Sequence, residues 1–136
     1  MTPAAEEAHR LLRLAARDRS TFVLLARLPD APLSAVGFHA QQAIEKALKA
    51  VSTLHGVETR RTHDLVALAQ ALGDTGCPIP CPLESLRLLN PFAVEVRYDD
   101  EFEPSVSRDE LTSTVDLVMA WAQSIQSTVI PDDGSA

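Results

Sequence analysis

The stretch from Ser34 to Gly56, SAVGFHAQQAIEKALKAVSTLHG, most constrains what the chain can fold into. Apolar residues recur in it at spacings of three and four, which draws one broad apolar stripe along a helix. That stripe consists of Val36, Ala40, Ala43, Ile44, Ala47, Leu48, Val51 and Leu54. The opposite face carries His39, Gln42, Glu45, Lys46 and Lys49, with Gln41 and Ser52 at its edges. A helix with so wide an apolar stripe and so ordered a polar one is expected at the centre of the fold.

Length and composition favour a single helical domain. The chain has 136 residues, enough to bury a substantial core, and an aromatic content of only 4%. Its many Ala and Leu residues favour packed helices, whereas strands prefer Val, Ile, Tyr and Phe. We therefore expect an all-α, up-and-down antiparallel bundle of four to five helices over residues 1–127, followed by a flexible tail at 128–136.

Proline and glycine mark the ends of the first two helices. We expect the first helix at 4–28, ended by Pro29, and the central helix at about 31–55. Asp30 is the expected N-cap of the central helix, and Gly56 suits the left-handed position that follows a helix. The spacing of the first helix predicts an inward face of Ala8, Leu11, Leu12, Ala15, Phe22, Leu25 and Leu28.

The middle of the chain predicts shorter elements. A third helix is expected at 63–72, with Thr62 as its N-cap and Gly73 at its end. A fourth helical stretch starts near Pro82 and is interrupted by Pro91, which predicts a kink or two short helices meeting at the preceding asparagine.

The chain then enters the segment FAVEVRYDD and a final helix. The alternation in FAVEVRYDD allows a strand, but the absence of another strand candidate favours a helix. Ser107 and Glu110 form a capping box that opens a last helix at 108–127. Its predicted inward face is Leu111, Val115, Leu117, Val118, Trp121, Ala122 and Ile125.

Charge and hydropathy restrict the partners of the chain. Twelve Lys and Arg against nineteen Asp and Glu give a net charge of −7, which opposes non-specific nucleic-acid binding, so no DNA partner is expected. A local basic patch could still bind RNA. Because no apolar run approaches the roughly 18 residues of a membrane span and the N-terminus is not a signal peptide, we expect no membrane association and a cytoplasmic location. Cys77 and Cys81 should be thiols there.

Several of these segments together resemble one protein family. The run FHAQQAIEKALKA, the run THDLVALAQAL, a stretch ending in VEVRYDD and a final helix with a tryptophan resemble the HEPN-domain family over residues 8–125. The resemblance implies a five-helix bundle, a homodimer and a role in toxin–antitoxin or host-defence systems. It also implies a minimal nucleotidyltransferase as a candidate partner, since many members are encoded beside one.

Many members of the family are metal-independent ribonucleases, but this sequence departs from their signature. That signature is an Arg followed by four to six residues and then a His, paired across the dimer. The four histidines are His9, His39, His55 and His63, and none has an Arg five to seven positions before it. The nuclease residues of the family therefore cannot be transferred to this chain.

The remaining half of the family pattern supplies the candidate site residues. The resemblance transfers Gln42, Glu45, Lys46 and Lys49 of the central helix, His63 and Asp64 of THDL, and Arg97 and Tyr98 of VEVRYDD. Two interpretations remain open for them. In one, Asp64 lies in the first turn of a helix and His63 packs or donates a hydrogen bond.

In the other, basic side chains meet at the N-terminus of the third helix and form an anion site for a nucleotide or RNA phosphate. That site would be made by Arg60, Arg61, His63, Lys46, Lys49 and Arg97. His39, Gln42 and Lys46 share one face of the central helix, where they form either a solvated or dimer-facing polar stripe or part of this binding cleft.

Other clusters do not indicate a cofactor or a metal. The carboxylates around Arg97 match no EF-hand spacing, and Cys77 and Cys81 are a single pair where zinc needs four ligands. No glycine-rich phosphate loop, nucleophile elbow or HExxH motif is present. We expect neither a cofactor nor a metal, and we expect two free thiols.

Three functions follow from these observations. The first is a non-catalytic, homodimeric binding module that pairs with a minimal nucleotidyltransferase and binds that partner, a nucleotide or RNA through a polar cleft. The second is a ribonuclease toxin with an atypical active site that uses His63 or His39 beside Arg97. The third is a structural subunit without a ligand. The missing Arg–His spacing favours the first.

Overall fold

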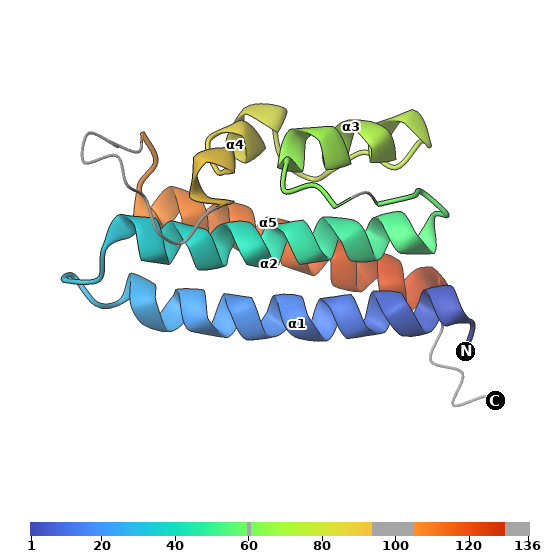
Figure 1. The fold of residues 1–136 in the computed structure, drawn as a ribbon, viewed down its shortest axis with the longest axis horizontal. Helices are drawn as coiled ribbons and strands as arrows, with labels where there is room; N and C mark the ends of the chain where they lie inside the picture. The colour runs from blue at the N-terminus through green and yellow to red at the C-terminus, as the bar shows by residue number, and fades with distance from the viewer. Residues whose placement is uncertain (60, 94–104, 130–136) are drawn as a thin grey trace.

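The computed structural model describes residues 1–59, 61–93 and 105–129 of the chain. These residues form helices and no strand, which confirms the all-α bundle (Figure 1). The elements in order are α1 (Pro3–Ala26), α2 (Leu33–Leu54), α3 (Leu65–Asp74), α4 (Leu83–Arg87), the 3₁₀ helix η1 (Asn90–Ala93) and α5 (Arg108–Val129).

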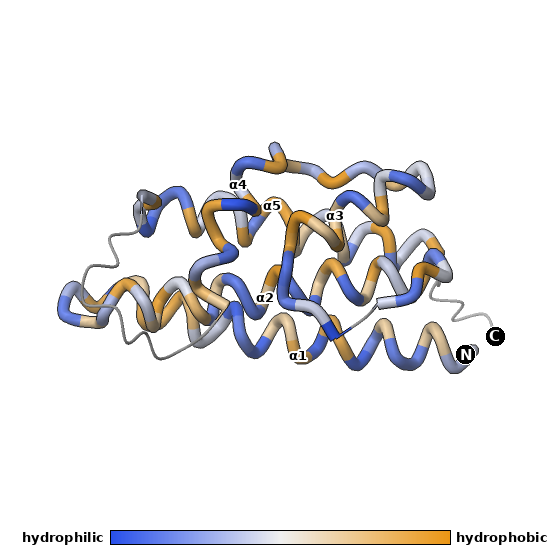
Figure 2. Tube along the Cα trace, turned by 45° about the horizontal axis from the view of Figure 1, so that its top comes forward, coloured by the Kyte–Doolittle hydropathy of each residue, from blue (hydrophilic) through white to orange (hydrophobic). Residues whose placement is uncertain are grey.

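Helix α2 lies at the centre of the bundle, as its wide apolar stripe predicts. It is enclosed by α1 on one side and by α3, α4 and η1 on the other, and α5 crosses it (Figure 1). Every residue of the predicted stripe is buried except Leu54, which is half-buried. Along the long helices, hydrophobic residues return at intervals of about one turn (Figure 2), because only one face of each helix meets the core.

Helix α1 ends earlier than predicted, at Ala26 rather than at residue 28. At this end the guanidinium of Arg108, from the first turn of α5, donates hydrogen bonds to the carbonyls of α1 and of the turn that follows it. These bonds run to Leu25, Ala26 and Leu28 at 3.1 Å each and to Ala31 at 2.6 Å. The last carbonyls of α1 thus have a partner that is distant in sequence, and Pro29, which has no N–H to donate, follows the end of the helix as predicted.

The boundaries of α2 were predicted in part. Asp30 is not the N-cap, because α2 begins at Leu33 and Pro32 occupies the cap position without a side-chain hydrogen bond. Gly56 follows the helix with φ of +68°, which confirms its predicted left-handed conformation.

Helix α3 is displaced by two residues from its predicted range. Asp64, not Thr62, is the N-cap, because its carboxylate accepts from the backbone N–H groups of the first turn. Gly73 lies inside the helix, and the left-handed glycine that follows the end is Gly76, with φ of +82°.

The segment after α3 forms two short helices, α4 and η1, as the interruption at Pro91 predicts. The ring of Phe92 in η1 packs directly on Gly37 of α2, where an added Cβ would lie 2.2 Å from the ring. Only glycine allows this approach. Of FAVEVRYDD, Phe92 and Ala93 lie in η1, and the remainder, with the neighbouring carboxylates, falls on residues 94–104, outside those described.

Helix α5 begins at the predicted capping box. The Ser107 hydroxyl accepts from the Glu110 backbone N–H at 3.1 Å and donates to the Glu110 carboxylate at 3.2 Å. The helix continues to Val129, two residues past its expected end. No helix in the described part of the chain is both long and apolar enough to cross a membrane.

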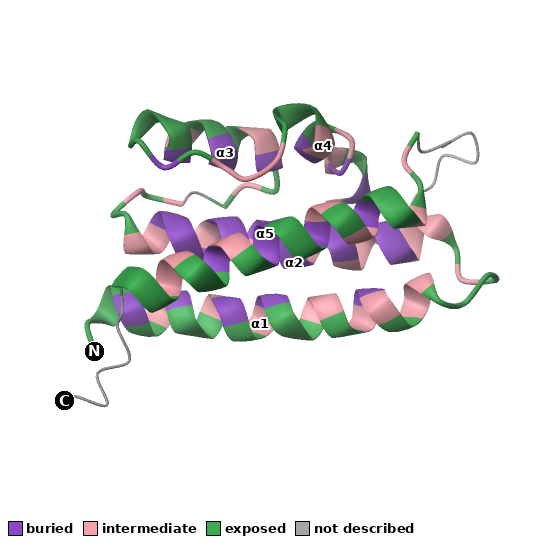
Figure 3. Ribbon diagram, turned by 180° about the vertical axis from the view of Figure 1, so that it is seen from behind, coloured by how far each residue is buried: buried purple, intermediate pink, exposed green. Residues whose placement is uncertain are grey.

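Two leucines predicted to face inward are exposed instead. Leu28 is 54% exposed because α1 has already ended, and Leu117 is 51% exposed because it projects from the outer side of α5. Seen from behind, α5 lies in front of α2 with much of its outer face open to solvent (Figure 3). Apolar periodicity alone placed Leu117 in the core, because a sequence pattern does not show which sides of a helix are covered by other helices.

Candidate functional site

The polar face of α2 holds the candidate site, and two of its side chains are buried. Gln41 is 0% exposed and Glu45 is 4% exposed, although the polar stripe was expected to be an outer face. They are covered because the chain turns back over α2 between its end and the start of α3 (Figure 1). Buried polar groups of this kind are costly unless they are hydrogen-bonded, so their partners define the site.

Glu45 is the centre of the first group of contacts, which we name the Glu45 cluster: Gln41, Glu45, Lys49 and His63. One carboxylate oxygen of Glu45 accepts from Gln41 Nε2 at 3.1 Å and lies 2.8 Å from His63 Nδ1. The other oxygen accepts from Lys49 Nζ at 3.1 Å. The carboxylate therefore has three partners, which offsets the cost of burying its charge.

The same cluster fixes the segment before α3. Gln41 Nε2 also donates to the backbone carbonyl of His63 at 3.1 Å, so both the main chain and the side chain of His63 are held by α2. The His63 side chain is nevertheless 65% exposed, and it therefore presents one ring edge to solvent while the other contacts Glu45.

A second group of contacts joins α2 to α1, and we name it the Asp18 cluster: Asp18, His39, Gln42 and Lys46. Lys46 Nζ forms an ion pair with the Asp18 carboxylate and lies 3.4 Å from the Gln42 side-chain oxygen. His39 Nδ1 lies 3.5 Å from the same carboxylate. Gln42 Nε2 donates to Gln41 at 2.8 Å and so links the two clusters.

Sequence reasoning missed Asp18, although a signal for it exists. Asp18 stands in the inward stripe of α1, between the buried Ala15 and Phe22 at helical spacing. A carboxylate at an inward position needs a cation from another helix. Beside it lies a shallow hollow of about 250 Å³, lined by Leu14, Arg17, Asp18, Thr21 and Lys46.

Asp64 caps the N-terminus of α3 and is not a member of the Glu45 cluster. Its carboxylate accepts from the N–H groups of Val66 and Ala67 at 3.0 and 3.2 Å and from Asn90 Nδ2 at 3.0 Å. Asn90 in turn accepts from the Leu65 N–H at 2.9 Å. These side chains occupy the N-terminus of α3, which favours the first of the two interpretations, with Asp64 in the service of the helix terminus, over an anion site there.

The structure brings some predicted residues together and leaves others apart. Lys46 meets His39 and Gln42 through Asp18, whereas Lys49 meets His63 through Glu45. Each of these lysines is paired with a carboxylate, so they do not form an uncompensated positive patch. Three other predicted residues, Arg60, Arg97 and Tyr98, lie outside the described residues, and Arg61 is exposed without a polar partner among those described.

The described side chains do not form a metal-binding cluster of three or more His, Cys, Asp or Glu. Cys77 and Cys81 are both free thiols. Burial raises the pKa of each thiol, so both are protonated at neutral pH and neither is an activated nucleophile.

The fold and the site define an all-helical bundle whose central helix carries a connected polar network at its contacts with α1 and with the segment before α3. Comparison with family models gives the family itself: the model of the HEPN domain matches residues 8–124. The chain belongs to the HEPN-domain family, as the resemblance indicated. Neither a curated protein nor a solved structure matches it significantly.

Proposed function

We propose that this HEPN protein is a non-catalytic, dimeric binding module that pairs with a minimal nucleotidyltransferase. Such a pair would belong to a toxin–antitoxin or defence-type system. The contact surface is the polar face of α2 together with the segment before α3 and the adjoining part of α1.

One observation carries this proposal: the cations of the site are held in place by the protein itself. Lys46 and Lys49 are mostly buried, at 25% and 17% side-chain exposure, and each is tied to a carboxylate. Hydrogen-bonded charges with little freedom form a rigid, directional surface, which suits recognition at low entropic cost. The absence of the Arg–His nuclease spacing is consistent with binding rather than catalysis.

The size of the hollow favours a protein partner over an enclosed small molecule. At about 250 Å³ it lies below the 300–1,000 Å³ typical of ligand pockets, so it could hold a protruding side chain or one phosphate but not a whole nucleotide. Its exposed rim residue, Arg17, would then contact the partner directly.

The test is capture of the tagged protein from its native host at native expression, with mass spectrometry of what is bound. Recovery of a small nucleotidyltransferase in roughly equal amount is expected. Arg17→Glu should reduce that recovery at least fivefold, because charge reversal at a contact repels the partner. Arg27→Glu, at another exposed arginine just beyond the end of α1, is the control and should leave the recovery unchanged. Recovery of the protein alone would contradict the proposal.

A second candidate function rests on the contact between Glu45 and His63. A carboxylate 2.8 Å from an imidazole that is otherwise exposed is an arrangement used in general acid–base catalysis. An atypical ribonuclease toxin would use His63, with His39 as the other candidate. Growth arrest by the overexpressed wild type but not by His63→Ala would favour this function over the first.

A further inference from the structure

A groove between α4 and α5 lies apart from the candidate site. Its volume of about 340 Å³ is within the range typical of ligand pockets, and it shares no residue with the Glu45 cluster or the Asp18 cluster. We name it the α4–α5 groove, and its walls include Cys81, Ser85, Leu88, Glu110, Thr114 and Leu117. A groove of this size can accept a few side chains of a partner.

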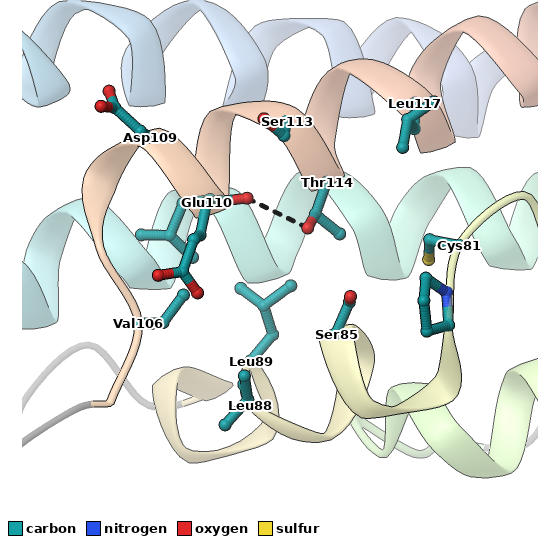
Figure 4. Close-up of a pocket in the computed structure, with 12 residues that line it drawn as sticks. Cys81, Ser85, Leu88, Leu89, Val106, Asp109, Glu110, Ser113, Thr114 and Leu117 are labelled. Carbon is teal, nitrogen blue, oxygen red and sulfur yellow. Dashed lines mark hydrogen bonds between the residues drawn. The ribbon is translucent and has the colours of Figure 1, made fainter.

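The two ends of the α4–α5 groove differ in chemistry (Figure 4). The Glu110 carboxylate lies at one end beside Val106, whereas Leu117 and Cys81 lie at the other. Leu117 is apolar and yet 51% exposed. Between the ends, the Ser85 hydroxyl has no hydrogen-bond partner within the described ranges. A ligand that follows the groove therefore meets an acidic end and an apolar end.

The two carboxylates that line the groove have no cationic partner in the part of the chain that the structure describes. Glu110 accepts from the Ser107 hydroxyl at 3.2 Å, and the Asp109 side chain is exposed. Acidic residues in the first turn of a helix are favoured by its dipole, so their position alone does not indicate a site. The charges around them are therefore decisive.

The carboxylates just outside the groove each have an arginine. Glu84 of α4 pairs with Arg87 at 2.7 Å. Asp116 of α5 pairs with Arg19 at 2.9 Å. Arg108, in the same turn as the two carboxylates of the groove, instead donates to carbonyls at the end of α1. The acidic end of the groove is thus left to be complemented by a cation from a partner.

The sequence next to the groove does not provide that complement. Residues 95–103 contain five carboxylates and one arginine, so their net charge has the same sign as the acidic end. A partner that enters the groove therefore has to be basic at this end, and apolar at the end formed by Leu117 and Cys81.

The length of the groove determines the kind of segment that fits. Glu110 and Leu117 are seven residues apart on α5, which is about 10.5 Å at 1.5 Å per residue. Over that length, about 340 Å³ corresponds to a mean cross-section of about 32 Å². A helix about 10 Å in diameter has a cross-section of about 79 Å² and is too wide. An extended chain covers the same distance in three residues at about 3.4 Å each.

We propose that the α4–α5 groove binds an extended segment of a partner protein in which a large apolar residue and a basic residue are three positions apart. The apolar side chain packs at the end formed by Leu117 and Cys81, and the basic side chain pairs with Asp109 and Glu110. The Ser85 hydroxyl is available to the backbone of the segment. The inference goes beyond the proposed function, because the surface and the chemistry of the partner both differ from those of the polar face of α2.

The first test is fluorescence polarisation with labelled nine-residue peptides. In the probe GSWSGRRGS, tryptophan and the first arginine are three positions apart, whereas in GSRWRGSGS, of identical composition, they are adjacent. The protein should bind the first probe about fivefold more tightly than the second, since only the first reaches both ends of the groove. Replacing both arginines of the first probe by glutamate should weaken binding further, and added salt should weaken binding of the first probe.

A charge variant tests the acidic end. Asp109→Asn combined with Glu110→Gln removes both carboxylates but retains the capping box, in which glutamine can replace glutamate. This variant should bind the first probe about fivefold more weakly. Glu58→Gln combined with Asp74→Asn changes the net charge equally at exposed positions elsewhere, and it should leave the affinity within about twofold.

A leucine variant tests the apolar end. Leu117→Ser should also weaken binding of the first probe about fivefold, because it removes an apolar contact at that end. Leu24→Ser, at a leucine of α1 that is 62% exposed, is the matched control and should leave the affinity unchanged.

The free thiols provide a measurement on the wild type, which keeps the inference testable if a variant fails to fold. Cys81 lines the groove and is half-buried, whereas Cys77 is buried. A saturating amount of the first probe should slow alkylation of Cys81 by iodoacetamide about fivefold, because it covers that end of the groove. Mass spectrometry measures each thiol separately, and the rate at Cys77 should not change.

Equal affinity for the two probes of identical composition, groove variants that bind like the wild type, or unprotected Cys81 would each overturn this inference. Equal affinity for the acidic probe would show that the groove selects apolar side chains regardless of charge, which contradicts it as well. None of these results depends on the nucleotidyltransferase or on the polar face of α2.

Discussion

The two carboxylates that contact α2 are alike in chemistry but not in surroundings. Glu45 belongs to α2 itself, has a side chain only 6% exposed and has three polar partners, one of them from the segment before α3. Asp18 belongs to α1, is 17% exposed and contacts two cationic or ionisable side chains. The Glu45 cluster is therefore mainly a device that fixes a loop, while the Asp18 cluster borders the open hollow.

This difference teaches that one polar stripe can serve two purposes. Where the chain turns back over the stripe, the polar groups become buried and their hydrogen bonds contribute to stability. Where the stripe meets the edge of α1, the charges remain partly hydrated and contribute less to stability, but a partner can reach them. Substitutions should separate these two roles, and they are described here from the largest effect to the smallest.

Removal of the Glu45 carboxylate should have the largest effect. Glu45→Ala leaves Lys49 and Gln41 without their shared acceptor, and we expect a loss of about 3 kcal/mol in the free energy of unfolding. Urea denaturation followed by circular dichroism measures it. Glu58→Ala, at an exposed glutamate nearby, is the control and should change stability by less than about 0.5 kcal/mol. Equal effects of the two variants would contradict the assignment of Glu45 as a buried hub.

Gln41 should rank second. Gln41→Leu keeps the volume but deprives Glu45 and the His63 carbonyl of a donor and Gln42 of an acceptor, which predicts a loss of about 2 kcal/mol. The exposed Gln70 of α3 gives the matched control, Gln70→Leu, which should be nearly neutral. If Gln41→Leu proved stabilising, the links between the two clusters would be of no energetic importance.

Asp18 should matter less for stability. Asp18→Asn weakens a partly hydrated ion pair, so we expect a loss of about 1 kcal/mol, and less at 1 M salt, where charges are screened within about 3 Å. The salt dependence of the urea midpoint, compared between wild type, Asp18→Asn and the exposed control Asp30→Asn, measures this. A loss as large as that of Glu45→Ala would erase the distinction between the clusters.

His63 should have the smallest effect on global stability and a local effect on the loop. Because its side chain is 65% exposed, His63→Ala should cost about 0.5 kcal/mol. Amide hydrogen exchange should nevertheless accelerate in residues 57–64, since one of the two contacts that hold the segment is lost. Unchanged exchange there would mean that the bond from Gln41 to the His63 carbonyl is sufficient alone.

The bundle and its central helix could be predicted from the sequence because periodicity reports directly which face of a helix is buried. The stripe from Val36 to Val51, the left-handed Gly56 and the capping box at Ser107 are all local patterns. The end of α1 at Ala26 and the start of α3 at Leu65 were each misplaced by two residues. Asp64 caps α3 locally, whereas the contacts that Arg108 and Asn90 make at these helix ends come from distant sequence positions and cannot be read from a local pattern.

For the candidate site, the sequence supplied candidate residues but not the contacts between them. The shared helical face suggested His39, Gln42 and Lys46 as candidates, and the family resemblance added Lys49; their role in binding stays a prediction. The partners of these residues could not be identified from a shared helical face, because Asp18 belongs to a different helix, where several arginines surround it in the sequence. Position 18 becomes informative only when the spacing between Ala15 and Phe22 shows that it faces inward.

The sequence by itself determined the all-α class, the central place of α2 and the family, since each follows from periodicity and local motifs. Only the tertiary structure decided that Glu45 and Gln41 are buried, that the N-terminus of α3 is occupied by Asp64 and Asn90, and that Leu117 is exposed. The physical reason is that a helix pattern specifies which side chains share a face, whereas what covers that face depends on segments that meet it from elsewhere in the chain.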